Sequence, residues 1–286
     1  MKSKKLKLSL FILLGILCLS ANYAGDWLER KSEHFVVYFT KDEKFAQDVL
    51  DAAEKDYRNI AYDLGYERYS EFWTWDKRVK IYIFNDRQSF LKATNQPAWS
   101  EGMADYTSKQ IVSYVWGKGF IESLLPHEIA HLVFRDFVGF KGEVPLWLDE
   151  GVAQWEEEAK RKNIKEIIQR NFEHDNLLLV SDIMKLDIAH LKDKQGLLIR
   201  PTRTKDGKDG VLFLSANNLV ELYYIEAVSL VGYLIEKFGS NAFSGFCREL
   251  RDGKTVEEAL SLAYPLQIHN LQEFEDGWRE YLKTVG

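Results

Sequence analysis

His127-Glu128-Ile129-Ala130-His131 is the most informative stretch of this 286-residue chain. On a helix, residues four positions apart lie on one face, so both imidazoles can reach a single metal ion. Glu128 is turned by about 100° from His127 and can lie beside such a metal without binding it, where it can accept a proton from water. A helix with two histidines on its polar side, and no metal, is the alternative for this pentapeptide alone.

A second stretch, Trp147-Leu148-Asp149-Glu150-Gly151-Val152-Ala153, follows in the sequence and leaves eighteen residues between His131 and Glu150. A catalytic zinc site needs three protein ligands and one open position. The spacing leaves room for one helix to end, a loop containing Gly139 to turn, and a second helix to return. A metzincin is excluded, because Phe137 occupies the position where that pattern has its third histidine.

Together the two stretches resemble the gluzincin metallopeptidases, in particular the aminopeptidase branch and the small peptidase MA-like family. The resemblance implies that Glu150 is the third zinc ligand beside His127 and His131. It implies an α+β, zincin-like fold, with a small mixed-sheet N-terminal lobe, a mainly helical C-terminal lobe, and zinc in the cleft between them. The implied reaction is hydrolysis of a peptide bond by zinc-activated water, with Glu128 as general base and then general acid.

The resemblance also extends to the apolar stretch Tyr223–Gly239. In the aminopeptidase branch a similar helix carries a tyrosine that hydrogen-bonds the oxyanion. Counting back from Gly239 places Tyr224 at that position, with Tyr223 as the reserve candidate. A phenol suits this role because its hydrogen bond strengthens as negative charge develops. An ordinary core position for Tyr224 is the alternative.

The chain departs from the family pattern at two places. Gln154 stands where thermolysin-like enzymes have an aspartate that orients a ligand histidine. Asp149 could serve instead, although we expect its side chain to point elsewhere on the helix. The segment Glu101–Asp105 does not match the amine-binding glutamate of the aminopeptidases, so exopeptidase specificity is not implied. It can still provide an edge strand along which an extended peptide lies.

The rest of the chain predicts strands and helices around these stretches. Segments rich in β-branched and aromatic residues predict two strands and a hairpin, at Phe35–Thr40, at Val79–Phe84, and at Met103–Tyr106 with Ile111–Val115. From about Ile121 onward the chain is predicted to be mainly helical, with helices over Leu124–Phe137 and about Leu148–Arg161. The charged run Glu156–Lys162 at the end of the second helix is interpreted as a solvated, ion-paired face. Pro201–Gly210 is predicted to be a polar, mobile loop.

Helices outside these segments are predicted from apolar spacing and from capping residues. A long amphipathic helix has its apolar residues at helical spacing from Ala46 to Leu64. Asn85 or Asp86 can cap a short helix after the second strand. Thr255 and Asn270, each followed three residues later by a glutamate, predict capped starts of two C-terminal helices.

The N-terminus reads as an export signal over residues 1–24. A basic start, Lys2–Lys7, precedes the apolar run Leu8–Leu19, which is shorter than the roughly 20 residues that span a bilayer. We therefore expect a secreted or periplasmic protein, with an uncleaved N-terminal anchor as the alternative. Residues 25–286 are expected to form one zincin-like peptidase domain, with an α/β lobe over about 25–138 and a helical lobe over about 139–286.

The charge and the cysteine content of the chain limit the kinds of partner and chemistry that we expect. The formal net charge of −6 gives no electrostatic reason to expect nucleic acid or an anionic membrane surface as a partner of the mature chain. Cys247 is the single cysteine after residue 24 and is expected to be a buried, inert thiol. Four histidines without ligand spacing are expected to be surface or structural residues: His34, His174, His190 and His269.

Two classes of function fit these observations, and the oligomeric state is left open. The first is a zinc-dependent peptidase that acts on a peptide or protein substrate. The second is an exported, catalytically inactive protein that binds zinc or a peptide on the same scaffold. The presence of Glu128 and of a candidate third ligand, Glu150, favours the enzyme.

Overall fold

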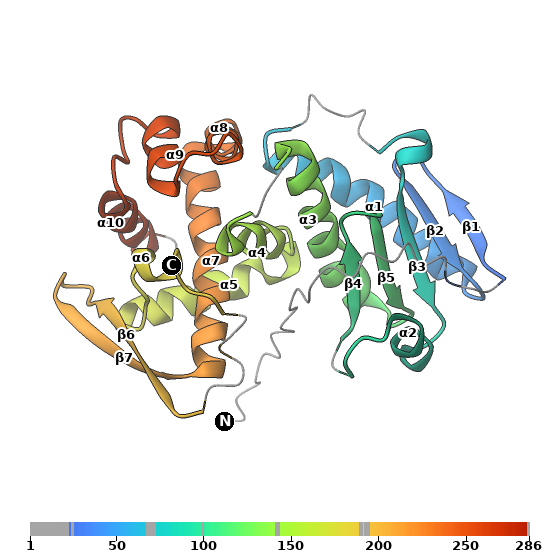
Figure 1. Cartoon of the computed structure of the whole chain (residues 1–286), viewed down its shortest axis with the longest axis horizontal. Helices are drawn as coiled ribbons and strands as arrows, with labels where there is room; N and C mark the ends of the chain where they lie inside the picture. The colour runs from blue at the N-terminus through green and yellow to red at the C-terminus, as the bar shows by residue number, and fades with distance from the viewer. Residues whose placement is uncertain are drawn as a thin grey trace.

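The computed structural model describes residues 23, 26–66, 73–98, 100–140, 144–188, 191 and 195–284. The predicted export segment lies outside the described residues except for Tyr23, and His190 lies outside them as well. The structure is mixed α/β, with a small mixed sheet in its N-terminal part and a helical C-terminal part (Figure 1).

The sheet has five strands in the order β1-β2-β3-β5-β4, and the central three, β2, β3 and β5, run parallel. The two edge strands, β1 and β4, are antiparallel to their neighbours. The central strands are buried along almost their whole length, as in a parallel sheet that is covered on both faces, and the predicted strands and hairpin are confirmed. Their bounds are β1 Leu28–Lys31, β2 Phe35–Phe39, β3 Val79–Phe84, β4 Gly102–Asp105 and β5 Gln110–Tyr114.

Helices and turns of the N-terminal part connect and cover this sheet. Helix α1 (Glu43–Asp63) packs its apolar stripe against β2, and Asp42 caps its first turn by accepting a hydrogen bond from the backbone N–H of Phe45. A short 3₁₀ turn, η2 (Trp75–Lys77), leads into β3, and α2 (Arg87–Thr94) follows it. The side chain of Asp86, one of the two predicted candidates, caps α2.

A π-helical turn, η3 (Phe120–Leu124), leads directly into α3 (Leu125–Val138). Pro126 lies in the first turn of α3, where proline is tolerated. The backbone N–H of Leu125 bonds to the carbonyl of Phe120, as the wider π turn requires. Helix α3 therefore starts at Leu125, next to the proline, and a helical turn of different pitch directly precedes it.

The prediction of one helix from about Leu148 to Arg161 is wrong. Helix α4 (Leu146–Trp155) ends early, and α5 (Glu158–Glu173) begins after a short break. The two residues at the break, Glu156 and Glu157, are buried instead of solvated, at 6% and 2% exposure. Buried carboxylates need partners, and the break lets both side chains reach them.

The C-terminal part is built around α7 (Ala216–Phe238), which runs through its middle (Figure 1). Among the described residues, α7 is the one helix long and apolar enough to cross a membrane, but 83% of its apolar window is buried inside the fold, as in a core helix. Cys247, on α8, is fully buried, as expected. The surrounding helices are α6 (Val180–Ile183), α8 (Ser240–Arg251), α9 (Val256–Ala263) and α10 (Leu271–Leu282).

The predicted mobile loop at Pro201–Gly210 is also wrong. Half of it lies in the strands of an antiparallel hairpin, β6 (Leu197–Arg203) and β7 (Asp209–Ser215), and the other half forms the turn between them. A turn containing Gly207, with φ of +81°, joins the two strands. The flanking strand residues are apolar on both faces: Leu212 and Leu214 are buried, whereas Ile199, Val211 and Phe213 are exposed.

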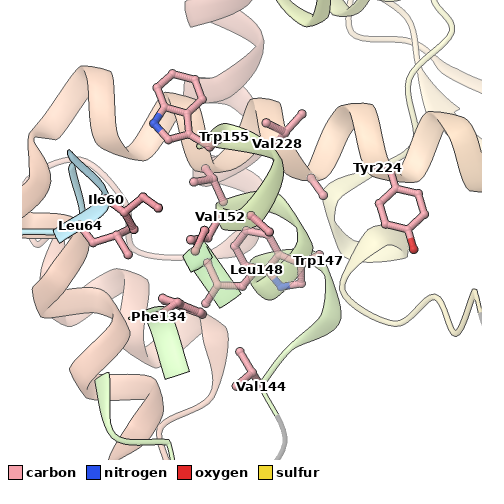
Figure 2. Packing of buried hydrophobic residues seen from close by; sticks show 14 of the residues in the cluster. Ile60, Leu64, Phe134, Val144, Trp147, Leu148, Val152, Trp155, Tyr224 and Val228 are labelled. Carbon is pink, nitrogen blue, oxygen red and sulfur yellow. The ribbon is translucent and has the colours of Figure 1, made fainter. Parts of the chain in front are cut away.

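Helix α4 lies between α3 and α7 and joins the two parts of the molecule. Figure 2 shows Trp147, Leu148 and Val152 of α4 among apolar side chains of the neighbouring helices. Gly151 permits this close packing, because an added Cβ would lie 2.7 Å from the carbonyl oxygen of Ala227 on α7. The glycine thus fixes how deeply α4, and the residues beside Gly151, sit in the core.

Candidate metal centre

Helix α3 presents His127 and His131 one turn apart on one face, and both are buried. Their Nε2 atoms lie 3.2 Å from each other, and the two rings are nearly perpendicular, at 84°. The prediction that both imidazoles lie on one face of a helix is therefore confirmed.

Glu150 reaches the same point from α4. Its Oε2 lies 4.0 Å from Nε2 of His127, and one ligand atom from each of the three residues lies within 4.8 Å of the others. All three side chains are buried, and Oε2 of Glu150 has no hydrogen-bond partner among the described residues. Burial raises the pKa of the Glu150 carboxyl to about 8, although the neighbouring His127 opposes this shift.

A carboxylate lies beside Nδ1 of each imidazole. Nδ1 of His127 lies 3.1 Å from Oε1 of Glu157, and Nδ1 of His131 lies 3.0 Å from Oδ1 of Asp149. An Nδ1 that gives its proton to a carboxylate leaves the Nε2 lone pair of a neutral ring directed at the metal position. His127 makes such a hydrogen bond to Glu157, whereas His131 and Asp149 lie at ion-pair distance without hydrogen-bond geometry.

The two orienting carboxylates are themselves paired. Arg135 donates a hydrogen bond of 2.7 Å to Asp149, while Glu157 accepts from Ser123 and Lys160. Burial alone would raise the pKa of Asp149, but His131 and Arg135 lower it below its ordinary value. Burial is likewise outweighed at Glu157, where His127 and Lys160 lower the pKa. Both groups are therefore held as anions beside the histidines.

Sequence reasoning missed the contact of Glu157 with His127; it named Asp149 as a possible partner of a ligand histidine but expected its side chain to point elsewhere. Glu157 was assigned to a solvated face, because its charged neighbours at helical spacing masked the break between α4 and α5. Asp149 was expected to point away, yet it contacts His131 while the next residue, Glu150, faces the metal position. Gln154, at the thermolysin-like position, is only half-buried. The adjacent acids Asp149 and Glu150 are the sequence feature from which the contact of Asp149 with a histidine could have been predicted.

Glu128 lies between the two histidines in the sequence of α3 and is buried. Burial raises the pKa of its carboxyl, while His127 and His131 pull the pKa down. A carboxyl with a raised pKa, next to candidate metal ligands, is suited to accept and return a proton.

Tyr106, in the turn between β4 and β5, is a site residue that sequence reasoning missed. Its ring lies edge-on to His131, with the centroids 5.9 Å apart, and the Arg135 guanidinium lies 4.4 Å from its ring centroid. Its hydroxyl oxygen is buried and has no hydrogen-bond partner among the described residues. Burial, and then the charges of Glu128 and nearby acids, raise its pKa well above the ordinary value. A lone tyrosine in a polar turn offered no pattern by which to find it.

Tyr224 is buried on α7, and Figure 2 shows its hydroxyl directed away from the axis of that helix. Burial raises the pKa of its phenol, and the charge of Glu150 on α4 adds to this effect. The adjacent Tyr223 is affected by Glu150 in the same way. Both tyrosines are therefore near enough to Glu150 for its charge to affect their pKa values.

The described histidines outside this centre have other partners. His34 is buried and bonds through Nδ1 to Glu54 at 2.8 Å, which ties β2 to α1. His174 bonds to a backbone carbonyl, and His269 pairs with Glu273 on the surface. Their surface or structural character is confirmed.

Buried His127, His131 and Glu150 could hold a metal ion, which would satisfy the unpartnered oxygen of Glu150 and the converging imidazole nitrogens. No protein-family model matches the chain, and the search of curated proteins found no match. The function is therefore inferred from the geometry of this centre and from the two stretches of sequence that form it.

Proposed function

We propose that the chain is a zinc metallopeptidase of the gluzincin type. The observation that carries the proposal is the convergence of His127, His131 and Glu150 at one buried point, with Glu128 beside them. Two imidazoles and one carboxylate are the three protein ligands of many catalytic zinc sites, which leave a further position for water or substrate. Zinc, when bound, supplies Lewis-acid chemistry that polarises a peptide carbonyl and lowers the pKa of water.

The side chains around the metal position have complementary roles. Glu128 accepts the proton of the attacking water and returns it to the leaving amine. Glu157 and Asp149 keep the two imidazoles in the tautomer that offers Nε2 to the metal. Tyr224 donates a hydrogen bond to the oxyanion, and Tyr106 is a second phenol near the same carboxylates.

The arrangement of the sheet supports a peptide as the substrate. Strand β4 is an edge strand that pairs on one side with β5, and Tyr106 follows it directly. An extended peptide can add to such an edge through backbone hydrogen bonds. In this proposal a zincin-like cleft, with zinc at its base, lies between the sheet and the helical part.

The experiment that tests the proposal compares the zinc-loaded chain with its Glu128→Gln variant on denatured casein. We expect this variant to keep its zinc content and to lose cleavage by at least about 100-fold, because the base is missing. The control is Glu166→Gln, which changes an exposed acid on α5 and should cleave normally. Cleavage that persists in Glu128→Gln contradicts the proposed base. A zinc-loaded chain that cleaves nothing supports the non-catalytic binding protein instead.

A further inference from the structure

Arg135 continues the row of side chains that carries the two histidines. It follows His131 by four residues on α3, so His127, His131 and Arg135 lie one after another on the same face of the helix. The side chain of Arg135 is 27% exposed, whereas both histidines are buried. Arg135 therefore lies beside the candidate metal centre, at the border between its buried groups and solvent.

The N–H edge of the Arg135 guanidinium holds Asp149. Nη2 of Arg135 donates a hydrogen bond of 2.7 Å to Oδ2 of Asp149, whose side chain is 1% exposed. The other carboxylate oxygen, Oδ1, lies 3.0 Å from Nδ1 of His131 without hydrogen-bond geometry. Arg135 thus supplies a directional contact that keeps the carboxylate beside the imidazole.

The same guanidinium also lies over the ring of Tyr106. Its central carbon is 4.4 Å from the ring centroid, within the roughly 6 Å over which a cation and an aromatic face attract each other. The rings of Tyr106 and His131 meet edge to face, with their centroids 5.9 Å apart. Arg135 on α3 therefore contacts two other parts of the chain, Asp149 on α4 and Tyr106 in the turn after β4.

The turn that carries Tyr106 has other contacts, which do not involve the candidate metal ligands. Asp105 closes the turn by accepting hydrogen bonds from two backbone N–H groups within it. Lys109, at the far end of the turn, pairs with Asp136 on α3. The contact with Arg135 differs from these, because Arg135 is also bonded to the carboxylate beside His131.

We propose that Arg135 is a positioning residue that fixes the edge strand β4 relative to the metal position. The inference rests on the proposed function, in which an extended peptide adds to β4. A planar guanidinium can use its N–H edge for a carboxylate and its face for an aromatic ring at the same time, which a lysine ammonium does not reproduce. Arg135 acts through Tyr106 and Asp149 and not on the reacting bond.

Two substitutions separate the two contacts of Arg135. Arg135→Lys keeps a cation for Asp149 but loses the planar face over Tyr106, whereas Arg135→Met loses both. We expect Arg135→Met to lower zinc affinity by about tenfold, as the loss of a group behind a metal ligand does, and Arg135→Lys to stay within about threefold. Competition with a chromogenic chelator measures both. Arg170→Lys, which changes an exposed arginine on α5, is the matched control.

Hydrogen exchange of the zinc-free chain reports on the contact with Tyr106 and requires neither metal nor activity. We expect the amides of residues 105–109 to exchange at least about fivefold faster in Arg135→Lys and in Arg135→Met, and at an unchanged rate in Arg170→Lys. Unchanged exchange in α7 establishes that each variant is folded. On an extended peptide, Arg135→Lys should raise KM more than it lowers kcat, because the peptide must then order the loosened turn when it binds.

Three results would overturn the proposal: unchanged exchange of the turn in both Arg135 variants, equal zinc affinities of Arg135→Met and Arg170→Lys, or equal KM values of Arg135→Lys and Arg170→Lys. Faster exchange and weaker zinc binding in a chain that cleaves no peptide would support the coupling through Arg135 and contradict the peptidase function alone. Failure of the inference and failure of the proposed function are thereby distinguishable.

Discussion

Glu157 shows how strongly the surroundings of a side chain decide its role. The residue lies in a run of charges, yet it is 2% exposed and contacts Nδ1 of His127. Ser123 and Lys160 also contact its carboxylate, so the carboxylate is held in place beside the imidazole. An acid in this position stabilises the neutral ring tautomer that presents Nε2 to a metal.

Replacement of Glu157 should therefore weaken zinc binding without removing a ligand. We expect Glu157→Ala to lower zinc affinity by about 10- to 100-fold, since His127 loses its orienting partner. The measurement is competition with a chromogenic zinc chelator. Glu158→Ala, which changes the exposed neighbour, is the matched control and should keep full affinity. Equal affinities in the two variants would show that Glu157 has no orienting role.

The two tyrosines near the centre make separable predictions. We expect Tyr224→Phe to lower kcat on a peptide substrate by about 100-fold with little change in KM, because the hydroxyl acts on the charge of the transition state. Tyr233→Phe, farther along α7, should be close to normal. A kcat lost in Tyr106→Phe and kept in Tyr224→Phe would contradict the assignment and move the oxyanion donor to the turn after β4.

The junction between β2 and α1 depends on a buried ionisable pair. Glu54 of α1 accepts hydrogen bonds from the backbone N–H and Nδ1 of His34, both at the start of β2. Burial alone would raise the pKa of Glu54, but the bonds to His34 and Ser32 lower it to about 2. Because the folded pKa lies below the unfolded value, this carboxylate stabilises the fold above about pH 4.5, and the stabilisation is lost as the pH falls towards 2.

The stability of Glu54→Gln should follow that dependence. At pH 7 we expect the free energy of unfolding to fall by about 2 kcal/mol relative to the unchanged chain, since each unit of pKa corresponds to about 1.4 kcal/mol and part of the effect is screened. Urea denaturation between about pH 7 and pH 2.5 measures the difference, which should shrink below about pH 4.5. Asp51→Asn, on the exposed side of α1, is the control. A difference that stays constant with pH would rule out the ionised pair as its source.

Residue spacing and capping residues within single segments predicted most of the helices and strands. The stripe of α1, the caps at Asp86, Thr255 and Asn270, and the β4–β5 hairpin depend on spacing within one segment, and all are confirmed. The break after Trp155 was missed, because it depends on where two carboxylates find partners in other parts of the chain. Tertiary contacts override a helical charge pattern in this way.

At the scale of the whole molecule, the candidate metal ligands lie on two helices, α3 and α4, which meet where the sheet part joins the helical part. The histidines of α3 belong to the layer beside α1 and the sheet, and Glu150 belongs to α4, which packs against α7. The spacing left room for the two helices to meet, and the resemblance to the gluzincin pattern predicted that Glu150 lies beside the histidines. The contact of Glu157 with His127 and the position of Tyr106 depend on the three-dimensional packing and left no comparable pattern in the sequence.

The metal content of the purified chain, measured by plasma mass spectrometry, tests the central claim most directly because it requires no known substrate. We predict about one zinc per chain, and a sharp loss of zinc in Glu150→Ala with helical content retained in circular dichroism. Glu166→Ala, an exposed acid on α5, should retain the full amount. A chain that takes up no zinc after reconstitution, or a Glu150→Ala variant that keeps all of it, would contradict a metal centre built from His127, His131 and Glu150.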